Sequence, residues 1–204
     1  MSGRIRIAMT AAPRPKFTYA EYLAAERSAD VKHEYLRGEI FAMAGGTPEH
    51  SRLAMSIGRE LGVLLRDRPC AVFSSDLRIR IEATNRATYP DVSVVCGKRE
   101  TAKDDPDALT NPIVIVEVLS DSTEGDDRGE KFAHYRRVPS LREYVLVSQR
   151  ARRIEVYRRE GVGAEWILSE ATSGEQAKLP SLGIAVSVDE VYRDPVADSA
   201  KQVV

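Results

Sequence analysis

An acidic residue stands at two points where the sequence otherwise predicts buried strands. Glu117 lies inside the almost continuously apolar run Pro112–Leu119, and Asp91 follows Pro90 near the start of the run Tyr89–Cys96. Leaving an ionised carboxylate unpaired in a dry strand would cost several kcal/mol. A buried cation, a metal ion or a proton taken up through a raised pKa must therefore compensate Glu117. The alternative to a metal site is a salt bridge to one of the many arginines.

A third acid, Asp76, heads a further predicted strand, Asp76–Ile81. Proline is tolerated at the first residue of a strand, so we expect Asp91 at a strand end where the sheet opens. If the strands carrying these acids are neighbours, the carboxylates converge and repel one another unless a divalent cation lies between them. Oxygen ligands favour Mg²⁺ or Mn²⁺ over zinc. The alternative role of Asp76 is to cap a turn at the strand end.

Lys131 is the basic residue that such a site would use. It lies on a predicted helix of about Asp127–Arg137, the next helix after the strand of Glu117. Tyr135 shares its helical face because residues four apart are neighbours, and Phe132 is expected to point into the core. A lysine at a metal site can orient the attacking water or stabilise charge on an attacked phosphate. The alternative is an ordinary solvated lysine on a helix surface.

The elements that would position these residues follow an α+β or mixed α/β pattern. Thr18 and Glu21 have the spacing of a capping box, and the pair Arg37-Gly38 predicts a hairpin turn. Thr47 and Pro48 predict the start of a longer amphipathic helix. Further expected elements are strands at 71–73, 76–81 (one face solvated), 89–96 and 112–119 (both faces covered), a loop at 97–111, the helix at 127–137, a meander at 143–148, 154–158 and 166–169, and a last strand and turn at 184–192.

Length and composition indicate one folded domain. The chain has 204 residues, 43% of them hydrophobic and 30% charged. We therefore assign residues 16–193 to a single domain, with mobile tails at 1–15 and 194–204. The longest purely apolar stretch, Ile113–Val116, is too short to cross a bilayer, which excludes a transmembrane enzyme or channel. Residues 1–15 show no apolar segment typical of a secretory signal.

Cysteine content and net charge further limit the classes of protein to which this chain could belong. The only cysteines, Cys70 and Cys96, are too few for a disulfide framework or a four-cysteine zinc site, so a reducing cytoplasm is the expected location. The formal net charge of −1 argues against a generally basic protein that coats nucleic acid. A local basic face remains compatible with this total.

A combination of motifs points to a known family. The runs concerned are Tyr89–Cys96, Pro112–Ser120 and Asp127–Tyr135, together with Glu34–Ile40, Pro48–His50, Ser75–Ile79 and Leu182–Tyr192. Together they resemble the bacterial putative restriction endonuclease family of the Uma-two type, within the PD-(D/E)XK nuclease superfamily, over about residues 16–193. The resemblance implies a restriction-endonuclease-like central mixed β-sheet flanked by helices, with an added N-terminal helix and hairpin and added C-terminal strands.

The resemblance also implies roles for individual residues. Asp91 and Glu117 would hold Mg²⁺ or Mn²⁺ and activate water against a phosphodiester of DNA. The superfamily pattern has a lysine at the position where this chain has Leu119. In this family the lysine of the following helix, here Lys131, is thought to replace it. The replacement is geometrically reasonable because only the position of the ammonium group near the water matters. Additional candidates for the site are Glu34, His50, Asp76 and Tyr135. The alternatives for Glu34 and His50 are an exposed strand glutamate and a surface or packing histidine.

The C-terminal third is rich in arginine, which bears on partners. Phosphate contacts need such cations, and the residues we expect to contact nucleic acid are Arg128, Arg136 and Arg137. The alternative is a solvated meander whose arginines pair with Glu143, Glu155 and Glu160. Superfamily nucleases often work as dimers, and apolar alternation at 144–147 and 154–157 would supply the edge of a homodimer.

Three functions are compatible with these features. The first is a metal-dependent DNA endonuclease in which a metal-activated water attacks phosphorus. The second is a nuclease-fold protein that binds nucleic acid or a partner without cutting, which Leu119 motivates. The third is a different phosphoester or small-molecule hydrolase with the same metal cluster. We favour the first.

Overall fold

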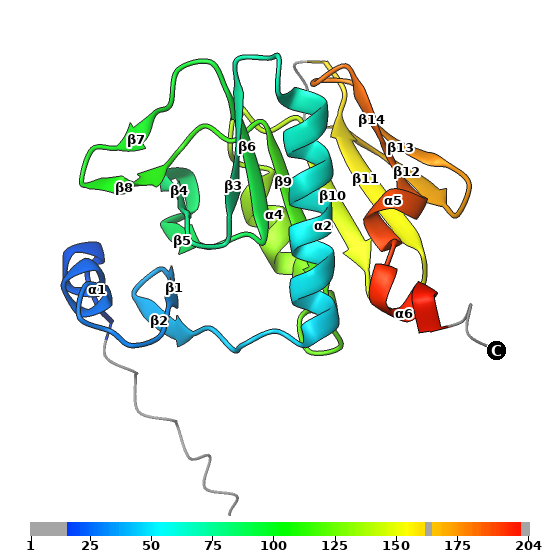
Figure 1. The fold of residues 1–204 in the computed structure, drawn as a ribbon. Helices are drawn as coiled ribbons and strands as arrows, with labels where there is room; N and C mark the ends of the chain where they lie inside the picture. The colour runs from blue at the N-terminus through cyan, green and yellow to red at the C-terminus, as the bar shows by residue number, and fades with distance from the viewer. Residues whose placement is uncertain (1–15, 162–164, 201–204) are drawn as a thin grey trace, which may run out of the picture.

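The computed structural model describes residues 16–161 and 165–200, so the expected tail at 1–15 lies outside the described residues. Its strands form two six-stranded mixed sheets and one two-stranded sheet (Figure 1). The expected α+β class, with helices flanking a mixed sheet, is confirmed. The strands are divided between two large sheets, whereas the family resemblance had implied one central sheet.

Sheet A contains the N-terminal hairpin and has the order β2-β1-β5-β4-β8-β7. Its strands are β1 (His33–Leu36), β2 (Glu39–Ala42), β4 (Arg78–Ile81), β5 (Arg86–Thr88), β7 (Thr101–Ala102) and β8 (Asp105–Leu109). Arg37 at φ 49° and Gly38 at φ 96° supply the two left-handed residues that a tight hairpin turn requires, so the predicted hairpin is confirmed.

Sheet B has the order β12-β11-β10-β9-β6-β3. Its strands are β3 (Cys70–Ser74), β6 (Val92–Cys96), β9 (Val114–Leu119), β10 (Glu143–Ser148), β11 (Arg153–Arg159) and β12 (Trp166–Thr172); β13 (Gln176–Leu179) and β14 (Ile184–Ser187) form the third sheet. The strands β9 and β10 are parallel, and the helical segment between them makes the crossover.

Two capping motifs start the N-terminal helices as the sequence predicts. Thr18 accepts from the Glu21 backbone N–H and the Glu21 carboxylate accepts from the Thr18 backbone N–H, while Thr47 caps the second helix ahead of Pro48. The helices are α1 (Tyr19–Glu26), α2 (Pro48–Leu65), α3 (Glu124–Asp126), α4 (Phe132–Tyr135), α5 (Val188–Tyr192) and α6 (Pro195–Ala200), with a 3₁₀ turn η1 (Glu82–Thr84) and a π-helical segment η2 (Asp127–Lys131). The predicted helix at 127–137 is thus π-helical at its start.

Helices cover both faces of sheet B. The α2 helix crosses one face and the segment α3-η2-α4 lies on the other (Figure 1). Along β9, Val116 and its even-numbered neighbours join the core under α2, whereas Ile115 and Leu119 join the core with Phe132. Every residue of β9 is buried, which confirms the prediction of a strand covered on both faces.

The expectation that the strand at 76–81 has a solvated face is wrong. All four residues of β4 are buried, including Arg78 and Arg80. Arg78 makes a bidentate ion pair with Asp105 of β8, and the guanidinium of Arg80 lies 3.8 Å from the ring centroid of Tyr19. The two arginines are therefore compensated by partners distant in sequence, which the alternating pattern does not reveal.

Other local expectations need correction. The expected loop at 97–111 contains β7 and β8, which join sheet A because Ala108 and Leu109 of β8 pair with β4. The strand β13 was not expected. The final turn is helix α5, and residues 195–200 of the expected tail form α6.

The strands at 144–147 and 154–157 cannot be free edges, since β10 and β11 each have a neighbour on both sides. The outer strands are β12 and β3, and the homodimer stays a prediction.

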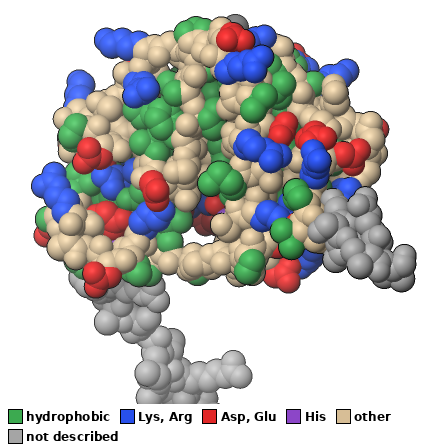
Figure 2. Space-filling view, in the orientation of Figure 1, with side chains coloured by type: hydrophobic (Ala, Val, Ile, Leu, Met, Phe, Trp, Pro, Cys, Tyr) green, Lys and Arg blue, Asp and Glu red, His purple; other side chains and the backbone are tan. Residues whose placement is uncertain are grey.

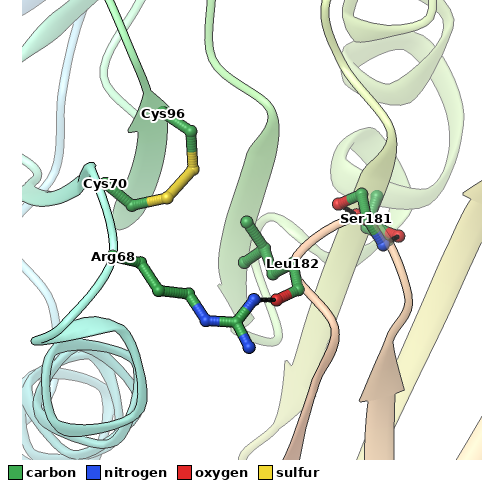
Figure 3. Close-up of a disulfide and its surroundings, with 6 residues drawn as sticks. Arg68, Cys70, Cys96, Ser181 and Leu182 are labelled. Atoms are coloured by element: carbon green, nitrogen blue, oxygen red, sulfur yellow. Dashed lines mark hydrogen bonds between the residues drawn. A yellow bond between two sulfur atoms is a disulfide. The ribbon is translucent and has the colours of Figure 1, made fainter.

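The two cysteines form a disulfide, which the sequence argument did not anticipate. Cys70 of β3 and Cys96 of β6 lie directly opposite each other in the antiparallel pair (Figure 3). Beside them, Arg68 donates to the carbonyl of Leu182, which ties the end of α2 to the segment after β13 (Figure 3). The cytoplasmic location was inferred partly from the small number of cysteines, so it stays a prediction without that support.

The helices of the described ranges include none that is long and apolar enough to cross a membrane.

The buried Arg78–Asp105 pair yields a stability prediction. Burial acts to raise the pKa of Asp105, but hydrogen bonds from Arg78 and Tyr19 lower it below its ordinary value. Because the pKa of Asp105 is lower in the folded than in the unfolded state, its ionised carboxylate stabilises the fold at pH values above the unfolded-state pKa. This stabilisation is lost as the pH falls through the folded-state pKa. We expect Asp105→Asn to lower the free energy of unfolding by about 3 kcal/mol at neutral pH.

Urea denaturation at neutral and acidic pH measures this effect, and the difference from wild type should shrink in acid. Asp104→Asn, at an exposed neighbour, is the matched control and should be close to neutral. Equal stability of the Asp105 variant and the control at neutral pH would contradict the assignment.

Candidate metal centre

Asp91 and Glu117 lie next to each other at the end of sheet B. The antiparallel register pairs Val92 of β6 with Val116 of β9, so the next residues outward, Asp91 and Glu117, are cross-strand neighbours. Cross-strand neighbours project from the same face of a sheet. The backbone N–H of Asp91 donates to Glu117 Oε2 at 3.4 Å, and the N–H of Val118 donates to Asp91 Oδ2 at 2.7 Å. The structure thus brings together the two acids that the sequence placed on separate strands.

Glu117 is held by two groups from the crossover helix. Lys131 Nζ lies 2.9 Å from its Oε1, and the Tyr135 hydroxyl donates to the same oxygen at 2.8 Å. The negative charge of Glu117 is therefore compensated by an ion pair with a lysine, and not by one with an arginine, which was the alternative considered. Burial and the nearby Asp91 still raise the pKa of Glu117 to about 8, although Lys131 acts to lower it.

Lys131 is enclosed by acids. Besides Glu117, Asp127 Oδ1 lies at 3.3 Å and Glu34 Oε1 at 3.9 Å from its Nζ. Burial acts to lower the pKa of Lys131, but these three carboxylates raise it well above its ordinary value, so the ammonium form is favoured. A solvated surface lysine, the alternative considered for this residue, is wrong because Lys131 is 9% exposed.

The sequence reasoning missed Asp127. Its side chain is buried, burial raises its pKa, and its Oδ1 has no hydrogen-bond partner although it faces Lys131. The spacing of four residues between Asp127 and Lys131 was a signal that these side chains would meet. The π-helical segment that carries both is a local geometry often found at functional positions.

Glu34 reaches the site from sheet A. Its carboxylate accepts from Arg86 at 2.8 Å and from the Thr88 hydroxyl, both on β5, the strand next to β1. Burial acts to raise the pKa of Glu34, but Lys131 and Arg86 lower it below its ordinary value. Glu34 therefore lines the cavity of Glu117 and Lys131 and is not the exposed strand glutamate considered as an alternative. Nothing in the sequence marked Arg86.

His50 contacts Asp91 from the first turn of α2. Its Nε2 lies 3.2 Å from Asp91 Oδ2, and this hydrogen bond raises the pKa of His50. A Cβ built on Gly46 would lie 2.8 Å from His50 Nδ1, so the absence of a side chain at residue 46 lets the imidazole sit there. The surface histidine considered as an alternative is not what the structure shows.

These side chains line one cavity of about 430 Å³. Its lining includes Glu34, His50, Asp91, Glu117 and Lys131. Within the described ranges, no group of three or more histidine, cysteine or acidic residues is arranged to hold a metal ion by itself. The arrangement offers two adjacent carboxylates with an ammonium group beside them.

Asp76 does not belong to this site. Its side chain is 88% exposed and forms an ion pair with Lys32 at 2.9 Å. The expected convergence of three acids is wrong for Asp76, because the strand that follows it joins sheet A, while Asp91 and Glu117 lie at the end of sheet B.

The arginine-rich region is mostly paired with acids. Arg128 contacts Glu124 and Glu155, and Arg158 contacts Glu160, so the alternative is correct for Glu155 and Glu160. For Glu143 it is wrong, because this buried carboxylate accepts from Ser181 instead. Arg136 and Arg137 are exposed at the end of α4. A role of Arg128, Arg136 and Arg137 in nucleic-acid contact stays a prediction.

The fold has a counterpart among solved structures. A crystal structure described as a putative nuclease belonging to DUF820, from Anabaena variabilis, superimposes with a TM-score of 0.68 over 85% of this chain and 96% of that chain. The sequence identity is 18%, so this likeness shows the fold. The shared fold is a mixed sheet flanked by helices.

The family follows from sequence. Residues 19–189 match the family described as "Putative restriction endonuclease" (Uma2), and the chain belongs to this family. Two Synechocystis sp. proteins, both named as uncharacterized (slr1290 and sll1609), are each 38% identical over 89% and 84% of this chain and 94% and 96% of their own lengths. The resemblance seen in the motifs is thereby confirmed.

The close approach at Gly46 gives a testable prediction. In Gly46→Ala the new Cβ displaces the His50 imidazole, which then loses its hydrogen bond to Asp91. We expect the pKa of His50, measured by NMR titration in metal-free buffer, to fall toward its ordinary value.

Gly45→Ala is the matched control, because a Cβ at that residue meets nothing within 4 Å. An unchanged His50 titration in Gly46→Ala, or an equal change in both variants, would show that the contact is not what holds the imidazole.

Proposed function

We propose that this protein is a metal-dependent DNA endonuclease that hydrolyses phosphodiester bonds. The observation that carries the proposal is the adjacency of Asp91 and Glu117 at the end of β6 and β9, with Lys131 Nζ 2.9 Å from Glu117 in a shared cavity. Membership of the restriction endonuclease family supports the same reading.

The residues present fit a hard divalent cation. Mg²⁺ is often bound through one or two carboxylates, with waters and substrate phosphate completing its shell, so two acids suffice. Asp91 and Glu117 would hold Mg²⁺ or Mn²⁺ through their oxygens. The ion, when bound, would supply Lewis-acid activation of water and of the phosphate.

Side chains of the protein would stabilise the developing charge and hold the two carboxylates in place. The Lys131 ammonium, held by three acids, is positioned to neutralise charge that develops on a phosphate oxygen. Tyr135 orients Glu117 by donating to its Oε1, which leaves Oε2 on the side of Asp91. His50 and the Val118 N–H fix the Asp91 carboxylate. Leu119 is buried in the core, and the lysine of the helix stands in for a strand lysine.

Cleavage of supercoiled plasmid with Mg²⁺ or Mn²⁺ tests the proposal. We expect Asp91→Asn, Glu117→Gln and Lys131→Met to lower the nicking rate on the order of 10²-fold or more while circular dichroism shows a retained fold. Asp76→Asn, an exposed acid outside the cavity, should cleave at the wild-type rate.

Two results would redirect the assignment. DNA binding without cleavage by the wild-type protein would favour the non-cutting nuclease-fold alternative. Turnover of a generic phosphodiester but not of DNA would favour a different phosphoester hydrolase.

Metal binding has its own readout. Millimolar Mg²⁺ should raise the melting temperature of the wild type, because a ligand that binds only the native state stabilises it by about 2.7 kcal/mol at a hundred times its Kd. Asp91→Asn, which removes one carboxylate, should show no such rise, whereas Asp76→Asn should respond like the wild type. A wild type that does not respond would argue against a metal centre.

A further inference from the structure

Lys131 and a cation at the candidate metal centre would share one carboxylate. The Lys131 ammonium lies 2.9 Å from Glu117 Oε1, and Glu117 is one of the two acids proposed to hold Mg²⁺ or Mn²⁺. Glu117 carries a single negative charge, so it cannot fully compensate a lysine and a divalent ion together. Two cations in a buried site repel each other strongly, because salt and water screen them little there. The ammonium group therefore competes with a metal ion for Glu117.

The carboxylates of the cavity can be reached from solvent. Figure 2 shows acidic side chains recessed in a hollow of the surface above the segment between β2 and α2. Residues of this segment line the same cavity as Asp91, Glu117, Asp127 and Lys131. A cation from solution thus has a route to acids that Lys131 already contacts.

Asp127 differs from the other acids around Lys131 because it has no second partner. The residue is 2% exposed, its Oδ1 lies 3.3 Å from Lys131 Nζ, and this oxygen accepts no hydrogen bond. In the described part of the chain, the ion pair with Lys131 is the one that Asp127 makes. A buried carboxylate in this condition is costly unless the ammonium group stays close to it.

The other acids are already compensated by different groups. Glu34 pairs with Arg86 at 2.8 Å and lies 3.9 Å from Lys131 Nζ, whereas Asp91 contacts His50. An ammonium group that moved toward Glu34 would meet a charge that Arg86 already neutralises. Asp127 is therefore the acid that gains most from a closer approach of Lys131.

The geometry allows this approach with little movement. Asp127 and Lys131 are four residues apart on one helical segment, so their side chains are neighbours. The Tyr144 hydroxyl donates to the Asp127 carbonyl at 2.9 Å and fixes the backbone there. A small rotation of the flexible lysine side chain would bring Nζ to the distance of about 2.8 Å that is usual for a charged hydrogen bond.

We propose that Asp127 is a positioning residue that receives the Lys131 ammonium when Glu117 binds its divalent cation. The inference rests on the proposed metal-dependent function and gives Asp127 a part in it. Glu117 then has a cationic partner both with and without metal. The exchange also keeps the ammonium group inside the cavity, where it can face a phosphate.

A double-mutant cycle on Mg²⁺ affinity tests this role. Isothermal titration calorimetry without DNA gives the Kd of wild type, Asp127→Asn, Lys131→Met and the double variant. We expect Asp127→Asn to weaken Mg²⁺ binding about tenfold, because the ammonium group loses its best alternative to Glu117. Lys131→Met should tighten binding, since the competitor is removed, and adding Asp127→Asn to it should change the Kd less than about twofold.

Glu130→Gln is the matched control. It removes the same charge from the residue next to Lys131, but the Glu130 side chain is 64% exposed, so it should bind Mg²⁺ like the wild type. Circular dichroism checks that each variant folds. If Lys131→Met does not fold, Lys131→Gln replaces it, since its amide donates to the same acids without a charge.

A crystal structure with Mg²⁺ bound gives a direct view of the exchange. Lys131 Nζ should then lie closer to Asp127 than to Glu117, which is the reverse of the present order. An ammonium group still nearest to Glu117 with the ion bound would contradict the proposal.

The calorimetric outcomes separate this inference from the metal centre itself. A loss in Asp127→Asn that disappears in the Lys131→Met background supports the exchange. An equal loss in both backgrounds would mean that Asp127 acts on the ion without the lysine, and no loss in either would mean that it has no part in binding. Both results overturn the inference and leave the metal centre in place. If neither the wild type nor Lys131→Met takes up Mg²⁺, the metal centre and the inference fall together.

Discussion

The contact between the buried carboxylate of Glu117 and the ammonium group of Lys131 is the interaction on which the site depends. Removing both charges from water is costly, and well-packed apolar residues in their place would often be as stable. Stability alone therefore gives no reason for an acid in the middle of β9. Asp127 and Glu34 add further negative charge around Lys131, and Asp91 lies beside Glu117, so we interpret the cluster as functional.

Both large sheets are needed to assemble the candidate metal site. Glu34 comes from sheet A, Glu117 from sheet B, and Asp91 lies in the short connection from β5 of one sheet to β6 of the other. Arg78 donates to the hydroxyl of Tyr89, two residues before Asp91, and is itself fixed by Asp105. The buried polar network of sheet A thus anchors the chain where it enters the site.

Elements with a strong local signal could be predicted from the sequence, and pairings between distant segments could not. Propensity and periodicity predict the apolar run of β9, the caps at Thr18 and Thr47, and the helix that carries Lys131. The division into two sheets follows from long-range pairing, and for that reason Asp76 was wrongly grouped with Asp91. The burial of Arg78 could not be foreseen either, since its compensating acid is 27 residues away in the chain.

The position of the lysine on a helix makes the site depend on helix packing. A strand lysine two residues after Glu117 would be fixed by the sheet; here Leu119 fills that place in the core, and the ammonium group depends on how η2 and α4 sit on the sheet. Phe132, adjacent to Lys131, stacks on Tyr144 of β10 with ring centroids 5.0 Å apart. The hydroxyl of Tyr144 also donates to the Asp127 carbonyl at the start of η2. The strand beside β9 therefore sets the register of the helix that completes the site.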